Sequence, residues 1–383
     1  MEPQNYVLIA GDLFPSGDVR ELFEKGDVSS IYGERICSLF RNSAYSVANF
    51  EGTLTDCNVK GEKVGARIKA SPSFMPGIKS LGLNAVALAN NHILDFGPQG
   101  YSDTVKSFES AGIQHFGTGP SESEIRKSIT VNIEGHRVSF YNVSECFFNV
   151  PSAKSPGANI YEDYTVCRDI AELKKCSDYV IVIYHGGSEF FPYPTNLLKK
   201  HFHRMVDNGA DFITAQHTHC IGCEEYYKGS YLLYGQGNFL FSRQRVENPM
   251  LKEGLLVQIV FGADKVEVVK HRTVIDGDIV RYAEDQSLDS FYERSKKVTD
   301  SQFLDSEYEK MKVRDFLPGV ILQHKGFLPF SKFLRKFMPG FFRKILMKSY
   351  SKEQILRNYK AAESEYYQQE RKAIWGYMLK KIK

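Results

Sequence analysis

The sequence has little of what marks secreted, disulfide-stapled or membrane-spanning proteins. Its 383 residues include seven cysteines, an odd number scattered along a long chain. Disulfide-framed proteins are usually shorter, with paired cysteines. No uninterrupted apolar stretch is long enough to span a bilayer. The first residues lack a basic segment followed by an apolar one, so we predict no signal peptide. We therefore expect reduced cysteines and a cytoplasmic protein.

Charge imbalance and internal repeats are also missing. The formal net charge is only +3, so the charge of the whole molecule favours no class of partner. Hydrophobic residues make up 42% and charged residues 25%, an ordinary balance for a chain that buries a core. We find no repeat of the kind that marks solenoids. The composition indicates one large globular domain or two ordinary ones.

What the sequence does have is a series of short apolar runs typical of strands buried on both faces. They are residues 6–10, 45–48, 85–89 and 179–184. Helical patterns lie between them, for example residues 98–111, where Pro98 stands near the start and Gly112 just past the end. From residue 224 to 275, strands joined by short turns follow one another instead. Strands alternating with helices and then with hairpins predict an α/β fold with mixed sheets.

Five polar clusters follow in order along the chain, each at the end of an apolar run. They are Gly11-Asp12, Asn49-Phe50-Glu51, Asn90-Asn91-His92, His185-Gly186-Gly187-Ser188-Glu189 and His217-Thr218-His219. Strand ends place such side chains in a crevice outside the sheet. Carboxylates, an amide and imidazoles without thiolate suit Mn²⁺, Fe²⁺, Zn²⁺ or Mg²⁺. The clusters together predict a hydrolytic centre with one or two divalent ions.

Each cluster taken alone has a plainer interpretation. Asp12 by itself would be a turn or helix-capping residue, and a lone His92 would be structural. Asp95 either orients His92 or belongs to a turn. His217 and His219 are two residues apart, which in extended backbone puts both side chains on one side. The signal is strong only because all five clusters occur in one order.

The pair Cys220 and Cys223 directly follows the last cluster. A redox or metal role is one interpretation of such spacing. We favour the other, two small buried residues that lead into a strand.

The five clusters together resemble the calcineurin-like metallophosphoesterase superfamily, and more closely its CapA (PgsA) branch of capsule and poly-γ-glutamate biosynthesis proteins. The segment Tyr234-Gly235-Gln236-Gly237-Asn238-Phe239 belongs to the same resemblance, which covers roughly residues 5–275. It implies a four-layer α/β/β/α sandwich with the site between two sheets. We expect this domain to span residues 1–285, followed by a helical, basic and aromatic C-terminal region over residues 286–383.

The resemblance also implies roles for individual residues. Asp12, Glu51 and His219 would hold one ion. Glu51, Asn91, His185 and His217 would hold the other, with Glu51 bridging. His92 would be the counterpart of the superfamily's catalytic histidine, with Asp95 beside it. We expect Lys69, Glu189 and Asn238 to contact the substrate.

This chain departs from the family pattern at several positions. Phe14 stands where ordinary members carry the histidine of the first motif, so the first ion would be weakly bound or absent. Gly186 replaces a tryptophan and Gln216 a histidine. Lys69 stands at the position of an arginine, which keeps the charge but not the bidentate geometry of a guanidinium.

Residues 316–352 carry eight lysines and arginines and no acidic residue, interleaved with Phe, Leu and Met. Such a segment is typical of a helix that lies on a membrane surface. Each basic residue near an anionic leaflet adds about 1 kcal/mol. Docking on the inner membrane face or on a synthase subunit is one interpretation, and packing of the segment on the α/β core is another. Nucleic-acid binding is the least favoured.

Two functions are consistent with the sequence. The first is a metal-dependent hydrolase that acts on a phosphoester or an amide-linked anionic polymer in capsule or cell-surface polymer biosynthesis. The second is a non-catalytic accessory subunit of a membrane-associated capsule or poly-γ-glutamate synthase, with a structural or vestigial metal site.

Overall fold

The computed structural model describes residues 4–15, 19–61, 66–145, 156–241, 249–262, 265–276 and 279–315. The chain forms two compact units, Met1–Tyr308 and Glu309–Lys383. The fold and the site described below belong to the first. The basic segment 316–352 lies outside the described residues. The domain division between residues 285 and 286 stays a prediction.

The larger sheet has eight strands in the described part of the chain, in the order β18-β17-β16-β1-β2-β5-β6, with β15 also paired to β1. Their bounds are β1 (Gln4–Phe14), β2 (Ser43–Phe50), β5 (Ala85–Ala87), β6 (Gln114–Phe116), β15 (Asn238–Phe241), β16 (Glu253–Phe261), β17 (Val266–Asp276) and β18 (Ile279–Tyr282). Strands β1, β2, β5 and β6 run parallel. Strands β16 to β18 extend the sheet in antiparallel hairpins.

The smaller sheet has six strands in the described residues, in the order β13-β14-β12-β11-β9-β8. They are β8 (Ile129–Ile133), β9 (His136–Ser144), β11 (Tyr179–His185), β12 (Phe212–Gln216), β13 (Glu224–Tyr227) and β14 (Ser230–Leu233). Strands β8 and β9 form an antiparallel hairpin at one edge of this sheet. Strand β11 runs parallel to both β9 and β12, which makes it the buried centre of this sheet.

Side chains between the two sheets form a common core. Val7 and Ile9 of β1 belong to the same buried cluster as Ile181 and Ile183 of β11. Because neighbouring residues of a strand point to opposite faces, the alternate residues of β1 face the other way. Leu8 and Ala10 accordingly belong to a second cluster, on the outer face of the larger sheet.

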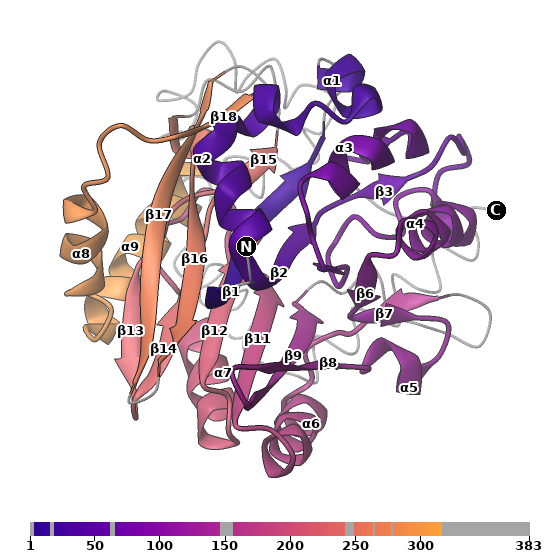
Figure 1. The fold of residues 1–383 in the computed structure, drawn as a ribbon. Helices are drawn as coiled ribbons and strands as arrows, with labels where there is room; N and C mark the ends of the chain where they lie inside the picture. Colours follow the sequence, from indigo (N-terminus) through magenta and orange to yellow (C-terminus); the bar gives the residue numbers. More distant parts are fainter. Residues whose placement is uncertain are drawn as a thin grey trace, which may run out of the picture. The chain divides into compact units, whose positions relative to one another are not determined.

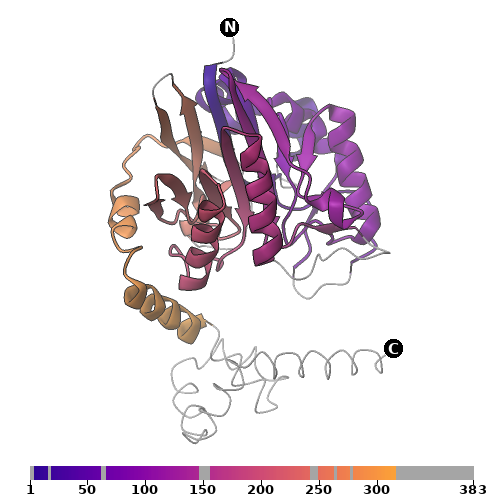
Figure 2. The same ribbon diagram turned by 90° about the horizontal axis from the view of Figure 1, so that it is seen from below.

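Helices cover both outer faces, which completes the four layers (Figures 1 and 2). The larger sheet carries α1 (Arg20–Lys25), α2 (Val28–Asn42), α3 (Met75–Ser80) and α4 (Gly97–Ala111), and the smaller carries α6 (Asp163–Lys175) and α7 (Asn196–Asp207). Helix α4 ends at Gly112 in the left-handed conformation (φ 73°), as the sequence predicts. The predicted α/β/β/α architecture is confirmed.

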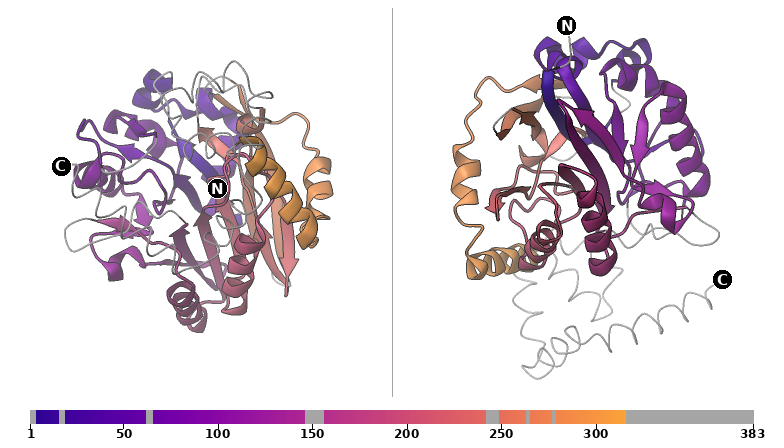
Figure 3. Two further views of the ribbon diagram at one scale, coloured as in Figure 1. Left: turned by 180° about the vertical axis from the view of Figure 1, so that it is seen from behind. Right: turned by 60° about the horizontal axis from the view of Figure 1, so that its bottom comes forward.

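Shorter elements connect these layers. They are β3 (Thr53–Leu54), β4 (Lys69–Ala70), β7 (Thr118–Gly119), β10 (Gly157–Ala158), α5 (Glu122–Ile125) and the 3-10 turns η2 (Pro72–Phe74) and η4 (Pro249–Lys252). After the last strand come α8 (Asp289–Ser295) and α9 (Ser301–Asp315). Helix α8 lies beside β13 (Figure 3). The backbone N–H of Glu224 in β13 donates to Ser295 Oγ of α8. None of the helices in the described ranges has the length and apolarity needed to cross a bilayer.

A close backbone approach at Gly11 shapes the edge of the larger sheet that carries the site. A β-carbon on Gly11 would lie 2.2 Å from the carbonyl oxygen of Gly237. Glycine therefore allows β15 to pair with the end of β1, with Asp12 opposite Asn238. On its other side Asp12 pairs with Asn49 of β2. Three polar residues thus stand in one row across three strands.

Candidate metal centre

The predicted ligands come together where strands of both sheets end. Asp12 lies near the end of β1, and Glu51 directly follows β2. His185 is the last residue of β11, and His217 follows the end of β12. Parallel strands present their carboxyl ends at one edge, so the strand ends of the two sheets bring these residues together.

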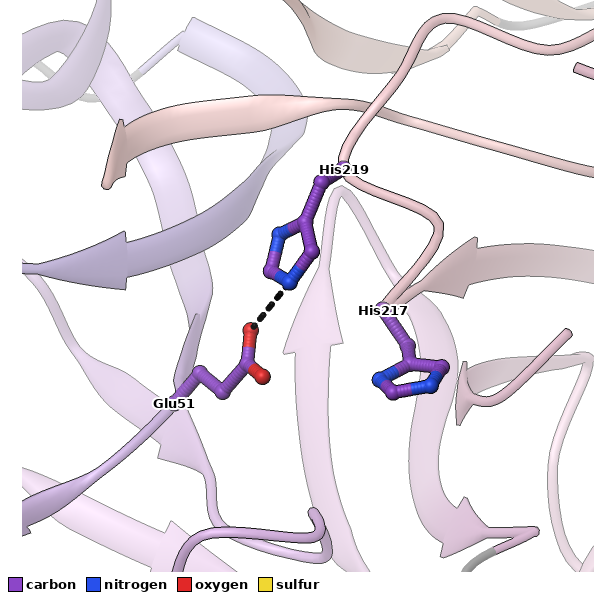
Figure 4. Close-up of side chains that lie close together, drawn as sticks. All are labelled: Glu51, His217 and His219. Atoms are coloured by element: carbon purple, nitrogen blue, oxygen red, sulfur yellow. Dashed lines mark ion pairs between the residues drawn. The ribbon is translucent and has the colours of Figure 1, made fainter. Parts of the chain in front are cut away.

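Glu51 occupies the middle of this group and is fully buried. Its Oε1 atom lies 3.7 Å from His92 Nε2 and 3.8 Å from His185 Nε2. Its Oε2 atom lies 3.8 Å from His219 Nε2, the contact drawn in Figure 4. One carboxylate therefore faces three imidazole rings, one at the end of β11 and two in the segments that follow β5 and β12.

The donor atoms fit a divalent ion. Glu51, His217 and His219 offer atoms within 4.8 Å of one another, as do Asp12, Glu51 and His185. Asn91 Oδ1 lies 3.1 Å from His185 Nε2 and adds an amide oxygen. In the described part of the chain, the buried atoms His219 Nε2 and His217 Nδ1 have no hydrogen-bond partner. Unsatisfied buried nitrogens are costly, and a cation would satisfy them.

The loop that carries His217 and His219 is not extended, so the reason we gave for their common direction was wrong. Both residues have positive φ, 82° and 53°, and so does Phe190 (61°) in the neighbouring loop. Such backbone costs of the order of 1–3 kcal/mol at a residue other than glycine. The two rings nevertheless lie close, with centroids 6.1 Å apart, because the turn directs both inward.

The two histidines differ in charge. Burial lowers the pKa of His217 to about 4, and the neighbouring His219 acts in the same direction. Burial would also lower the pKa of His219, but the carboxylates of Glu51 and Asp12 outweigh it and raise the value to about 9. At neutral pH the protein without an ion therefore carries a neutral His217 and a protonated His219. An ion that uses the ring nitrogen of His219 must displace that proton.

His92 is held by Asp95. The distance from His92 Nδ1 to Asp95 Oδ2 is 2.5 Å, and the same oxygen accepts a hydrogen bond from the backbone N–H of Ile68. A carboxylate on Nδ1 fixes the ring so that Nε2 faces Glu51. The structure thus places Asp95 where it can orient His92, one of the two alternatives from the sequence, and their catalytic role stays a prediction.

The three residues predicted to contact the substrate differ in their burial and in their hydrogen-bond partners. Lys69 Nζ donates to the carbonyl oxygens of Asp56 and Cys57 and to Asn58 Oδ1, which uses all three ammonium protons. Asn238 is fully buried and contacts His219 Nδ1 through Oδ1 at 2.9 Å. Glu189 is exposed, and its charge acts to raise the pKa of His217. Substrate binding by these residues stays a prediction.

Two other sequence features belong to the apolar interior. Phe14 packs against Phe50 and Phe241, with ring centroids 6.4 and 5.8 Å away. Cys220 and Cys223 are buried, and burial raises the pKa of Cys220 to about 12. The interpretation of these cysteines as small buried residues agrees with the structure.

Two residues that we gave no role contact the predicted ligands. Asn49 Nδ2 lies 2.7 Å from Asp12 Oδ1 and 3.2 Å from His185 Nδ1. The backbone N–H of Glu145 donates to the carbonyl oxygen of His185 at 2.9 Å, and its Oε2 atom accepts a hydrogen bond from the backbone N–H of Gly187. Asn49 is the last residue but one of β2, and Glu145 directly follows β9. A polar residue near the end of a buried strand is the same signal that identified the ligands.

Comparison with known proteins agrees with this geometry. The model of the bacterial capsule synthesis protein family PGA_cap matches residues 6–243, which include every residue discussed above as a candidate ligand. The chain belongs to the PGA_cap family. The CapA (PgsA) resemblance is therefore confirmed.

Several curated proteins are similar to this PGA_cap chain. The capsule biosynthesis protein CapA of Bacillus anthracis is 25% identical over 61% of this chain and 59% of its own length. The PGA biosynthesis protein CapA of Bacillus subtilis (strain 168) is 28% identical over 61% of this chain and 62% of its own. A "Probable polyglutamine synthesis accessory protein" of Mycobacterium tuberculosis is 33% identical over 54% of this chain and 58% of its own. The chain thus spans about three fifths of the length of these relatives.

Solved structures are more distant. A 5'-nucleotidase precursor from Thermus thermophilus aligns with 80% of this chain and 58% of its own, at 14% identity and a TM-score of 0.37. A hypothetical protein from the same organism aligns with 71% of this chain and all of its own, at 14% identity and a TM-score of 0.46. At these scores neither likeness carries an argument.

Proposed function

We propose that this PGA_cap protein is a divalent-metal-dependent hydrolase that acts on a phosphoester or an amide-linked anionic polymer in capsule or cell-surface polymer biosynthesis. The observation that carries the proposal is the buried Glu51 carboxylate, which faces the Nε2 atoms of His92, His185 and His219 at 3.7–3.8 Å. The names of the Bacillus relatives support the polymer context.

The donors that would hold one or two ions are Asp12, Glu51, Asn91, His185, His217 and His219. The mixture of oxygen and imidazole donors admits Mn²⁺, Fe²⁺, Zn²⁺ or Mg²⁺. A bound ion of this kind polarises a phosphoryl or acyl oxygen and lowers the pKa of water.

His92 has the geometry of a proton donor in this reaction. Asp95 contacts Nδ1, so a proton given up by the ring would leave from Nε2, the atom that faces Glu51. A proton passed from Nε2 to the leaving group would neutralise the charge that develops there. The backbone N–H of Ile68 fixes the Asp95 carboxylate, which keeps the His92 ring from turning.

The open side of the centre supports entry of a substrate. Asn91 and His217 are half-buried and Glu189 is exposed, whereas Glu51 and Asp12 are fully buried. A scissile group would therefore approach past Asn91 and His217. The buried carboxylates behind them provide the negative charge that retains the ion.

One observation favours the second function, an accessory subunit without catalysis. The aromatic ring of Phe14 packs into the apolar interior at the position of the first-motif histidine. The name of the Mycobacterium tuberculosis relative also contains the word accessory. In that case the metal centre would stabilise the fold of a synthase subunit.

The test separates the two functions. The protein loaded with Mn²⁺ or Zn²⁺ is assayed on bis(p-nitrophenyl) phosphate and on γ-glutamyl oligomers, beside Glu51→Ala and a chelated sample. We expect hydrolysis of one substrate class that both controls abolish. A His92→Ala protein that binds metal, lacks hydrolysis and still supports polymer production in cells would favour the accessory function.

We also propose that the basic segment 316–352 binds an anionic membrane surface. The segment lies outside the described residues, so the proposal is supported by composition alone. The segment contains eight basic residues and no acidic one, and basic residues are attracted to anionic lipid. The full chain should sediment with vesicles that contain anionic lipid at low salt. A full-length variant with these eight residues changed to glutamine should not. Equal sedimentation of both would exclude the segment as the membrane contact.

A further inference from the structure

The two helices after the last strand, α8 and α9, lie beyond residue 243, where the match to the PGA_cap family ends. They pack against two segments of the chain that closely follow candidate ligands. Residues 190–193 come after the His185 cluster, and residues 221–224 come after His219. The two helices therefore contact the chain next to both groups of histidines in the smaller sheet.

Arg294 of α8 holds the segment that follows His219. Its Nε atom donates to the carbonyl oxygen of Gly222 at 2.8 Å, and its Nη2 atom donates to that of Ile221 at 3.0 Å. The guanidinium is planar, so its two donors form a rigid fork that fixes the direction of both carbonyl groups. The segment next to His219 is thus held by a residue outside the family match.

Aromatic side chains of α9 hold the other segment. The ring of Tyr308 meets that of Phe191 edge-on, with centroids 5.8 Å apart, and Phe303 meets Tyr193 edge-on at 5.2 Å. Both distances are typical of attractive aromatic pairs. Phe191 is buried, so Tyr308 forms part of its apolar surroundings.

Phe190 joins the two segments to each other. Its backbone N–H donates to the carbonyl oxygen of Thr218 at 2.8 Å, and its ring stacks on that of His219 with centroids 6.1 Å apart. Phe190 has a φ of 61° and His219 a φ of 53°. Backbone of this kind is costly outside glycine and persists only where the surrounding structure holds it. The contacts from α8 and α9 on either side of this pair supply such support.

We propose that residues 289–308 of α8 and α9 act as a strap that keeps these two loops in place, with Arg294 as a positioning residue for His219. The effect on metal binding rests on the proposed metal-dependent function. Without the guanidinium fork, the carbonyl groups of Ile221 and Gly222 lose these donors, so the turn that carries His219 opens more often. A ring that spends less time aimed at the ion binds it less tightly.

A matched control separates this role from general stabilisation of the fold. Arg294→Ala removes two donated hydrogen bonds between the strap and the segment after His219. Asn196→Ala also removes two, since Asn196 Nδ2 donates to the carbonyl oxygen of Ser301 at 2.9 Å and to Asp305 Oδ1 at 2.7 Å. Asn196 is the first residue of α7, so this variant loosens the strap where it meets that helix.

Hydrogen exchange of the metal-free full chain and Mn²⁺ titration of the same samples test the strap. In Arg294→Ala we expect amide exchange in residues 217–224 to be about tenfold faster than in the wild type. The Mn²⁺ affinity should fall about tenfold. Asn196→Ala should leave both values within about twofold of the wild type. Arg294→Lys keeps a charged donor but not the fork, so its values should lie between those of the wild type and Arg294→Ala.

The outcomes distinguish this inference from the proposed function. Exchange and affinity that stay at the wild-type level in a folded Arg294→Ala protein would overturn the positioning role. An equal effect of Asn196→Ala would overturn it too, because the helices would then only stabilise the fold. A wild type that binds no Mn²⁺ would overturn the proposed function, whereas the exchange rates of the metal-free protein would still decide whether the strap holds the loops. If Arg294→Ala fails to fold, Arg294→Lys carries the comparison.

Discussion

The Nδ1 atom of His92 lies 2.5 Å from Asp95 Oδ2, while the Nε2 atom of the same ring faces Glu51 at 3.7 Å. This pair therefore connects the candidate metal centre to a side chain that can move a proton. In the proposed reaction two tasks are separate, since Glu51 and its partners would hold an ion and His92 would protonate the leaving group.

This separation predicts that variants of His92 and Asp95 hydrolyse substrate more slowly but bind as much metal as the wild type. His92→Gln should lower kcat by about 100-fold or more, the usual contribution of a general acid. Asp95→Asn should lower it less, because the ring remains but its orientation is weakened. Steady-state hydrolysis of a phosphodiester and the Mn²⁺ content of the same samples check this. Loss of metal in parallel with loss of rate would contradict it.

Metal affinity should rise with pH. His219 has a pKa near 9 before an ion binds, so at pH 7 its ring is protonated and must lose that proton on binding. His217, with a pKa near 4, is already neutral and adds no dependence above about pH 5. We expect release of one proton and an affinity that increases about tenfold per pH unit up to about pH 9. Calorimetry in buffers of different ionisation enthalpy measures the proton count, and zero at pH 7 would contradict the assignment.

Gly11→Ala should destabilise the fold strongly. The new β-carbon would lie 2.2 Å from the carbonyl oxygen of Gly237, so β1 and β15 must separate. We expect a loss of at least about 2 kcal/mol in the free energy of unfolding. Gly112→Ala is the matched control, because its β-carbon meets nothing within 4 Å and only the positive φ opposes it. That variant should lose about 1 kcal/mol, the cost of a β-carbon in the left-handed conformation. Urea unfolding that ranks the two variants in the opposite order would contradict the close approach.

The thiols of Cys220 and Cys223 should be inert in the folded protein. Burial raises the pKa of Cys220 to about 12 and that of Cys223 higher still, so almost no thiolate forms at neutral pH. Cys176 is exposed and serves as the internal reference. Pulsed alkylation followed by peptide mass spectrometry should label Cys176 first and the other two only after unfolding. If the Cys220→Ser variant binds less metal than the wild type, the interpretation of these cysteines as buried structural residues is wrong.

Much of the fold could be predicted because strands buried on both faces have continuous apolar sequences. Residues 6–10 and 179–184 lie inside β1 and β11. Strand β15 was not predicted, since it has four residues and its partner β1 is more than 200 residues away in the sequence. Short strands of that kind are specified by tertiary pairing and not by local pattern.

The same limit applies to the centre. Polar residues at strand ends identified Glu51 and the histidines as candidates, but the register that places Asn49 beside Asp12 exists only once β1 and β2 have paired. The left-handed backbone at His217 and His219 also has no local signal that a sequence pattern could reveal. The orientation of each imidazole ring toward the carboxylates depends on the folded backbone and cannot be predicted from the sequence pattern.

Anomalous diffraction from a crystal soaked in Mn²⁺ tests most directly whether Glu51 anchors a divalent metal centre. We expect one strong peak within about 2.2 Å of a Glu51 carboxylate oxygen and of His219 Nε2. The same soak of Glu51→Ala should show none. A wild-type crystal without a peak at Glu51, or with its peak bound by other side chains, would contradict the assignment of this site.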